Sequence, residues 1–218
     1  MRGFYFITHR PLSRRGLAAD VKAALAAGVR VVQYRDKEAD TRTLYEEACL
    51  LRKLCRGVLF LVNDRVDVAL AVEADGVHLG QQDLPCRVAR RLLGPDKIIG
   101  VTVSSLAEAR QAVRDGADYL GVSPIFPTCT KPDAGRACGL ELLRQIRAQV
   151  SLPLIAIGGI TLENAPQVAA AGADGLCAIS AVLSEPDVEA AIRRFQRLFA
   201  TGRELTGPAA SIREGLAP

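Results

Sequence analysis

Short apolar runs alternate with amphipathic stretches along almost the whole chain. The runs are continuously hydrophobic rather than alternating, which is typical of parallel strands covered on both faces. They predict strands at residues 4–8, 31–35, 59–63, 76–79, 98–103, 119–123, 154–158 and 176–180. The stretches between them predict helices at residues 14–27, 41–55, 65–74, 86–93, 106–115, 140–150, 163–171 and 186–200.

This succession of eight strand–helix units predicts an α/β fold, a single-domain (β/α)8 TIM barrel of parallel strands. A weak repeat marks the helix-to-strand turns AAGVRVVQYR, VEADGVHLG, RDGADYLGV and AAGADGLCAI, where Gly supplies the left-handed residue that ends a helix. An open doubly wound sheet is the alternative architecture. We expect the barrel to span residues 1–205 and the Gly-, Pro- and Ala-rich residues 206–218 to form a loose tail.

Carboxylates follow two neighbouring predicted strands, Asp64 after residues 59–63 and Asp83 after residues 76–79. Parallel strands deliver such side chains to the same end of a barrel, where catalysis takes place. Two bare carboxylates about 4 Å apart repel by about 4 kcal/mol at an effective dielectric constant near 20, and a divalent cation relieves that repulsion. Oxygen ligands that leave positions for water and phosphate favour Mg²⁺. The alternative is that Asp64 caps the following helix and Asp83 lies in an ordinary turn.

Two further segments place polar groups at predicted strand ends. QYRDK at 33–37 directs Gln33, Arg35 and Lys37 to one side of an extended segment, toward the two carboxylates, where they can bind phosphate oxygens. A solvated surface turn is the alternative. AIGGI at 156–160 resembles a phosphate grip, in which glycine N–H groups approach the anion and Ser180 adds a hydroxyl. A tight strand-to-helix turn without a ligand is the alternative there.

The loop PTCTK at 127–131 offers two threonine hydroxyls and the Lys131 amine, and it can close over an anion. A mobile basic loop is the alternative, and Schiff-base formation at Lys131 is disfavoured because a loop lysine is hard to desolvate. His78, at a strand end, is either a general acid or base or a hydrogen-bonded part of the barrel rim.

Composition narrows the function classes. A net charge of +4, with no basic run interleaved with aromatic residues, argues against nucleic acid and for a phosphorylated small molecule. No apolar span of about 18 residues and no signal-peptide pattern occur, so we expect a cytoplasmic protein without membrane attachment. The six cysteines form no C-x-x-C pair, which predicts reduced thiols. A homo-oligomer is compatible with the sequence, which does not define the oligomeric state.

Taken together, several segments resemble the thiamine-phosphate synthase family over about residues 4–195: QYRDK, VNDRVDVALAVEADGVHLGQQDLP, IIGVTVSSLAEA, GADYLGVSPIFPTCTK, LPLIAIGGITLEN and AGADGLCAISAV. The resemblance implies an Mg²⁺-dependent transferase. Its reaction joins 4-amino-2-methyl-5-hydroxymethylpyrimidine diphosphate to 4-methyl-5-(2-phosphoethyl)thiazole and releases thiamine phosphate and diphosphate.

The resemblance also assigns roles to individual residues. It implies that Mg²⁺ is held by Asp64 and Asp83, and that Arg35, Lys37 and Lys131 stabilise the departing diphosphate. The pyrimidine diphosphate would contact Gln33, Arg35, Lys37, Asn63, Thr102 and Lys131. The thiazole phosphate would be held by Thr128, Thr130, Gly159, Ile179 and Ser180, with Cys129 between the two threonines.

The chain departs from the family pattern at a few positions, with Thr102 in place of Ser, Tyr34 and Asp36 in place of Leu and Glu, and Cys129 in place of Pro. Position 36 points away from Arg35 and Lys37, so we expect activity to be retained.

Three other functions remain open. A thiazole tautomerase shares the barrel and AIGGI but typically lacks the carboxylates and the T-x-T-K loop; a regulator would bind a phosphorylated ligand without turnover; a phosphosugar isomerase or aldolase has no evident use for either feature.

Overall fold

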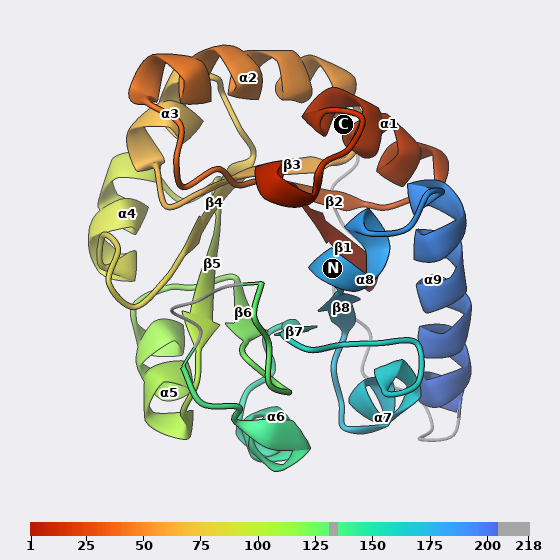
Figure 1. The fold of residues 1–218 in the computed structure, drawn as a ribbon. Helices are drawn as coiled ribbons and strands as arrows, with labels where there is room; N and C mark the ends of the chain where they lie inside the picture. Colours follow the sequence, from red (N-terminus) through yellow and green to blue (C-terminus); the bar gives the residue numbers. More distant parts are fainter. Residues whose placement is uncertain (131–134, 205–218) are drawn as a thin grey trace.

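A computed structural model describes residues 1–130 and 135–204 of the chain. Parallel strands close into a barrel in which each strand bonds to the next and β8 bonds back to β1, with the helices arranged around it (Figure 1). The strands are β1 Gly3–Ile7, β2 Val31–Tyr34, β3 Leu59–Asn63, β4 Gly76–Leu79, β5 Ile98–Val103, β6 Tyr119–Val122, β7 Leu154–Ile157 and β8 Gly175–Cys177. The predicted (β/α)8 barrel is confirmed, and the open sheet is excluded.

Each of the eight predicted helices is found to within about four residues, whereas the short helix α8 and a 3₁₀ turn were not predicted. The helices are α1 Leu17–Ala26, α2 Thr41–Leu54, α3 Val66–Ala71, α4 Cys86–Leu93, α5 Leu106–Arg114, α6 Gly139–Gln149, α7 Ala165–Ala170, α8 Ile179–Leu183 and α9 Val188–Glu204, with a 3₁₀ turn η1 at Arg10–Leu12. The long helix α9 packs against α1 and α7, so the last helix closes the outer layer beside the first (Figure 1). The expected tail at 206–218 lies outside the described residues. No helix that the structure describes is long and apolar enough to span a bilayer.

The eighth unit differs from the sequence prediction. The strand expected at residues 176–180 ends at Cys177, and Ile179 and Ser180 instead open the short helix α8. The whole stretch GLCAISAVL is apolar or small, so hydrophobicity does not mark where the strand stops. Val182 and Leu183 of this helix are buried, and that packing fixes the change of direction.

Two layers of apolar side chains hold the barrel. Alternate residues of each strand point into the barrel or outward to the helices, as the period of two requires. On β1, Tyr5 and Ile7 belong to the cluster inside the barrel, whereas Phe4 and Phe6 pack beneath the helices. The polar groups of the inner layer therefore lie directly below the C-terminal ends of the strands.

At the opposite, N-terminal end of the barrel, three aspartates repeat one contact. Each lies just before an even-numbered strand and accepts a hydrogen bond from a backbone N–H of the preceding strand, Asp75 from Phe60 at 2.7 Å, Asp118 from Ile99 at 2.7 Å and Asp174 from Leu154 at 3.0 Å. Each also pairs with an arginine, Arg52 of α2 at 3.2 Å, Arg90 of α4 at 2.6 Å and Arg147 of α6 at 2.9 Å, respectively. This end of the barrel thus matches every one of these carboxylates with a cation and an N–H donor.

The turns before these aspartates require a left-handed residue. Gly116 and Gly172 fill that position with φ of 87° and 98°. In the turn before β4 the position is held by Glu73, with φ of 52°. The expected glycine of that repeat, Gly76, lies in β4 instead, where an added Cβ would meet the backbone of Ile98. The sequence prediction was therefore wrong for this one turn.

Candidate active site

A cavity of about 380 Å³ opens at the C-terminal end of the barrel. Nearly all of the predicted site residues line it: Gln33, Arg35, Lys37, Asn63, Asp64, Asp83, Thr102, Thr128, Thr130, Gly159, Ile179 and Ser180. Cys129 is exposed and does not line the cavity. Lys131 lies outside the described residues. Residues that were predicted at the ends of separate strands therefore line one cavity.

The carboxylates of Asp64 and Asp83 interact across the ends of β3 and β4. Asp64 has the left-handed φ of 60°, and its N–H donates to the carbonyl oxygen of His78 at 2.8 Å, which holds it against the neighbouring strand. The Asp83 carboxylate accepts the N–H of Gly80 at 2.7 Å, which fixes its orientation. Asp64 does not cap α3, because the residue at that cap is Arg65. The cap alternative is therefore wrong for Asp64, whereas Asp83 does close a local turn.

Asp64 and Asp83 place two groups of like charge next to each other. Burial, followed by the neighbouring Asp83, raises the pKa of Asp64 to about 6, while the Lys37 ammonium, 2.7 Å from Asp64 Oδ2, acts in the opposite direction. Among the described residues no group of three or more metal-ligating side chains occurs. A cation at this position would have two carboxylates from the protein and its other ligands from water or substrate, and that donor set suits Mg²⁺.

A buried threonine fixes the segment that carries the basic residues. The Thr8 hydroxyl at the end of β1 accepts the N–H of Arg35 at 2.8 Å and donates to the Arg35 carbonyl oxygen at 3.1 Å. Arg35 is therefore held by its backbone while its side chain lines the cavity. Thr8 was not identified from the sequence, because nothing local distinguishes it from other strand-end hydroxyls.

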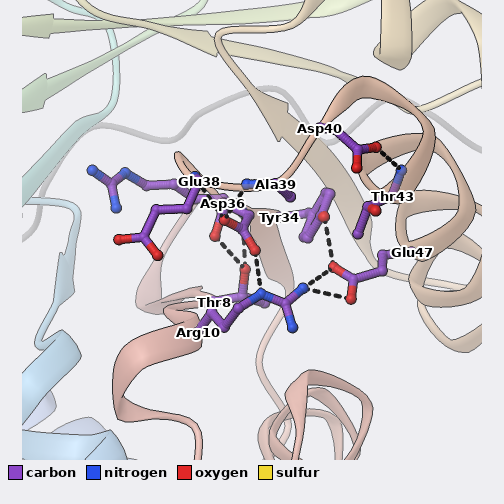
Figure 2. A network of polar contacts seen from close by, with 10 residues as sticks. Thr8, Arg10, Tyr34, Asp36, Glu38, Ala39, Asp40, Thr43 and Glu47 are labelled. Carbon is purple, nitrogen blue, oxygen red and sulfur yellow. Dashed lines mark hydrogen bonds and ion pairs between the residues drawn. The ribbon is translucent and has the colours of Figure 1, made fainter.

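The outer side of this segment is braced by the network that Figure 2 shows. Arg10 forms an ion pair with Asp36 and donates to Glu47 of α2 at 2.5 Å, and the Tyr34 hydroxyl also donates to Glu47 at 2.8 Å. Asp36 thus turns away from the cavity, as expected. Tyr34 and Asp36, two residues at which the chain differs from the family pattern, both have polar partners on this outer face.

Five polar side chains form a hydrogen-bonded chain across the inside of the barrel, below the cavity. Gln33 Nε2 donates to the Tyr5 hydroxyl at 2.9 Å, and the Tyr5 and Tyr119 hydroxyls lie 2.7 Å apart. His78 Nδ1 lies 2.8 Å from the Tyr119 hydroxyl, and His78 Nε2 lies 2.8 Å from Thr102 Oγ1. Both imidazole nitrogens are therefore engaged, as in the rim alternative for His78. Neither tyrosine was identified from the sequence, although a buried phenol in an apolar strand calls for a partner.

The glycine pair after β7 lies under the loop that follows β6. Gly158 and Gly159 have φ of 98° and 62°, and an added Cβ at Gly159 would meet the carbonyl oxygen of Pro127 at 2.5 Å. The loop is bonded to this turn, because Phe126 N–H donates to the Gly158 carbonyl oxygen at 3.0 Å. Only glycine fits this close approach, and both glycines line the cavity. Thr128 and Thr130 of the same loop line the cavity beside them.

Comparison with known proteins gives consistent findings. The family model described as thiamine monophosphate synthase matches residues 4–182. A thiamine-phosphate synthase of Chloroflexus aurantiacus is 55% identical over 203 residues, which cover 92% of this chain and 94% of that protein. A thiamine-phosphate synthase of Moorella thermoacetica is 55% identical, covering 84% and 88% of the two chains. The solved structure of a thiamine phosphate pyrophosphorylase from Pyrococcus furiosus superposes with a TM-score of 0.84 at 45% identity, covering 92% of this chain and 96% of that one.

Proposed function

The chain belongs to the thiamine monophosphate synthase family, and from that premise we propose that it forms thiamine phosphate at the C-terminal end of the barrel, over an Mg²⁺ ion held by Asp64 and Asp83. It is an enzyme of thiamine biosynthesis, a transferase. It joins 4-amino-2-methyl-5-hydroxymethylpyrimidine diphosphate to 4-methyl-5-(2-phosphoethyl)thiazole and releases diphosphate. The requirement for Mg²⁺ and the roles of individual residues are the proposed part.

One observation carries the metal proposal: two carboxylates from adjoining strands meet at the cavity, where burial and then the neighbouring Asp83 raise the pKa of Asp64 to about 6. The three aspartates at the N-terminal end are each paired with an arginine, whereas at this site Asp64 is paired with the ammonium of the half-exposed Lys37 and lies beside a second carboxylate. When bound, Mg²⁺ acts as a Lewis acid and neutralises negative charge on the diphosphate oxygens. Asp64 and Asp83 hold it in place.

The chain's own cations bind the rest of the diphosphate. Arg35 and Lys37 both line the cavity, Lys37 lies 2.7 Å from Asp64, and Thr8 holds the backbone of Arg35. As the bond to the pyrimidine methylene breaks, charge builds on the departing oxygens, and fixed cations stabilise that charge more than they stabilise the substrate. Lys131 takes the same role in this proposal, on the strength of the family pattern alone. Asn63 and Thr102 complete the wall around the pyrimidine diphosphate.

The opposite wall binds the thiazole phosphate. Gly159 and Ser180 line the cavity, and Thr128 and Thr130 line it from the loop above. In this proposal the Gly159 N–H and the Ser180 hydroxyl donate to the phosphate. Backbone N–H groups at a glycine turn suit phosphate, because no side chain separates the anion from the donors. A thiazole fixed there by its phosphate presents its ring nitrogen to the pyrimidine methylene carbon. Ile179 provides apolar lining, and Cys129, being exposed, is the weakest member of the proposed set.

No protein nucleophile or strong base is needed in this proposal. The electron-rich aminopyrimidine stabilises the positive charge that develops on its methylene as diphosphate departs, and the thiazole nitrogen then forms the new carbon–nitrogen bond. His78 is not assigned to proton transfer, because both of its ring nitrogens are engaged in hydrogen bonds within the barrel. We further propose that the enzyme works in the cytoplasm on these small molecules, without nucleic acid or membrane.

The test is diphosphate release by the purified protein with both substrates, with Mg²⁺ or with EDTA. We expect release that depends on both substrates and on Mg²⁺, together with thiamine phosphate in equal amount. Turnover that persists in EDTA would refute the metal assignment and favour a cofactor-free isomerase such as a thiazole tautomerase. Binding of a phosphorylated ligand without any diphosphate release would favour the regulator.

A further inference from the structure

The buried chain inside the barrel links two walls of the cavity. It begins at Gln33 of β2 and ends at Thr102 of β5, and both of these side chains line the cavity. Between them lie Tyr5, Tyr119 and His78, which are 2%, 1% and 5% exposed. A hydrogen-bonded chain of this kind has a direction, because each hydroxyl has one hydrogen to donate and a neutral imidazole has one donor and one acceptor.

The amide end sets the direction. Gln33 presents its NH₂ group to Tyr5, so the Tyr5 oxygen accepts at that contact. The hydrogen of Tyr5 then has one acceptor among the described residues, the oxygen of Tyr119. Burial raises the pKa of both tyrosines far above their usual range, so both remain neutral hydroxyls that donate one hydrogen each.

The rest of the direction follows from this start. The hydrogen of Tyr119 is directed to His78 Nδ1, which therefore accepts, and a neutral His78 carries its own proton on Nε2. The Nε2–H group donates to Thr102 Oγ1. The Thr102 hydroxyl hydrogen is then left to point to the cavity. If the link between the tyrosines were reversed while Gln33 still donated, the Tyr5 hydrogen would be buried without an acceptor, which is costly.

The surrounding backbone is shaped around the two rings at the centre. An added Cβ at Gly100 would lie 2.0 Å from Tyr119 Cζ, and one at Gly121 would lie 3.0 Å from His78 Cε1. Glycines on β5 and β6 thus leave space for these rings. The His78 and Tyr119 rings also pack at a centroid distance of 5.4 Å. Their positions are therefore fixed by packing, and the hydrogen bonds have a defined geometry.

We propose that Tyr5 and Tyr119 are positioning residues that hold His78 as the Nε2–H tautomer and so set the direction of the whole chain. In that state the cavity presents a hydrogen-bond acceptor, the Gln33 amide oxygen, and a donor, the Thr102 hydroxyl. A 4-aminopyrimidine offers the complementary groups, an amino donor and ring-nitrogen acceptors. The identity of the ligand rests on the proposed function, whereas the tautomer does not.

The direct test is the tautomer of His78 in the ligand-free protein, measured from the ring ¹⁵N chemical shifts. The chain has two histidines, so a His9→Gln variant assigns the spectrum. We expect His78 to show a protonated Nε2 and an unprotonated Nδ1. In Tyr119→Phe, which removes the donor to Nδ1, we expect this preference to be lost. A wild-type Nδ1–H tautomer would overturn the proposal, because it requires the whole chain, including the Gln33 amide, to run in the opposite direction.

Tyr34→Phe is the matched control, since Tyr34 is a buried tyrosine of β2 whose hydroxyl bonds to Glu47 on the outside of the barrel. We expect it to leave the His78 shifts unchanged; the same change in both variants would mean that loosened packing, not the hydrogen bond, moves the tautomer, and would overturn the proposal. Tyr5→Phe should weaken the preference as Tyr119→Phe does, and it serves if Tyr119→Phe is poorly folded.

Kinetics provide a second readout of the same proposal. In Tyr119→Phe we expect the KM for the pyrimidine diphosphate to rise about three- to tenfold, as for the loss of one oriented hydrogen bond, with the KM for the thiazole phosphate unchanged. An equal rise in both constants would contradict the role in reading the pyrimidine. A wild-type protein that makes no thiamine phosphate but shows the Nε2–H tautomer would count against the proposed function and leave the direction of the chain intact.

Discussion

The two ends of the barrel use carboxylates in opposite ways. At the N-terminal end, Asp174 is 5% exposed at its side chain, lies 2.9 Å from Arg147 and accepts the N–H of Leu154. At the C-terminal end, Asp64 lies beside a second carboxylate, Asp83, and its pKa is raised to about 6. At one end each carboxylate is matched with an arginine, and at the other end two carboxylates lie together at a cavity.

This difference separates stability from function in a single fold. A carboxylate that is paired and hydrogen-bonded stabilises the folded chain, and its removal leaves buried donors without partners. Two carboxylates placed together disfavour the ionised fold, so their arrangement is explained by a ligand rather than by stability. Substitutions at the two ends should therefore have opposite consequences for turnover and for the free energy of unfolding.

The largest expected effect is on turnover at the C-terminal end. Asp64→Asn or Asp83→Asn should lower kcat by about 100- to 1000-fold, because each removes an Mg²⁺ ligand that stabilises charge on the leaving diphosphate. The KM for the thiazole phosphate should change by less than about twofold, since that substrate binds the opposite wall. Steady-state kinetics with both substrates measure these constants.

The same variants should not be less stable in urea, because asparagine removes the like-charge repulsion and keeps an oxygen acceptor. If these variants lost as much unfolding free energy as the N-terminal-end variant Asp174→Ala, the contrast between the two ends of the barrel would be wrong.

At the N-terminal end, Asp174→Ala should lower the free energy of unfolding by about 3 kcal/mol, because the Arg147 guanidinium and the Leu154 N–H both lose a buried partner. The kcat of the folded fraction should stay close to that of the wild type. Urea denaturation and kinetics well below the melting temperature measure the two quantities. Asp174→Asn is the control, since it keeps an acceptor for the N–H and should cost less. A fall in kcat comparable to that of Asp64→Asn would contradict the comparison.

The affinity for Mg²⁺ should depend on pH in a way set by Asp64. Its pKa is raised from 3.8 to about 6, mainly by burial, so below about pH 6 it is protonated and must lose a proton to bind metal. The affinity should therefore fall about tenfold per pH unit below that point and level off above it. The stability of the metal-free protein should change with pH in the opposite direction to the metal affinity. Because the pKa of Asp64 is higher in the folded than in the unfolded chain, Asp64 favours folding at low pH, and this contribution to the free energy of unfolding is lost as the pH rises from about 4 to about 6.

Calorimetric titration of Mg²⁺ from about pH 5 to about pH 8 measures this dependence, with Asp64→Asn as the control that should bind weakly and with a flatter slope. A pH-independent affinity in the wild type would show that Asp64 is not a ligand.

The smallest effect is expected within the N-terminal end itself. Asp118→Ala should cost only about 1 kcal/mol of stability, less than Asp174→Ala, because the Asp118 side chain is 45% exposed and its pairing with Arg90 is screened by water. Urea denaturation of the two variants side by side tests the ranking. Equal costs would mean that burial does not determine what these repeated contacts contribute.

Most of the fold and of the cavity lining could be predicted because short segments of the sequence determine them. Parallel strands covered on both faces are continuous apolar runs, and the residues just past their ends must face the same rim. Asp64, Asp83 and Arg35 were identified in this way, and the structure brings them to one cavity. The boundary between β8 and α8 was missed because the stretch is uniformly apolar, and packing rather than pattern decides where it turns.

What the sequence did not reveal depends on long-range contact. The Tyr5 and Tyr119 hydroxyls meet across 114 residues of chain, and neither position looks unusual within its own strand. The repeated turns were predicted from their glycines, but the aspartates of the same turns, Asp75, Asp118 and Asp174, were not identified, because their arginine partners lie in other helices. Glu73 shows that the conformation is required even where glycine is not used.

The most direct test of the central claim is a crystal structure with Mg²⁺ and the pyrimidine diphosphate bound. The account predicts a metal about 2.1 Å from an oxygen of Asp64 and an oxygen of Asp83, with diphosphate oxygens and water as its remaining ligands. A diphosphate bound away from β3 and β4, or a metal that contacts neither carboxylate, would contradict it.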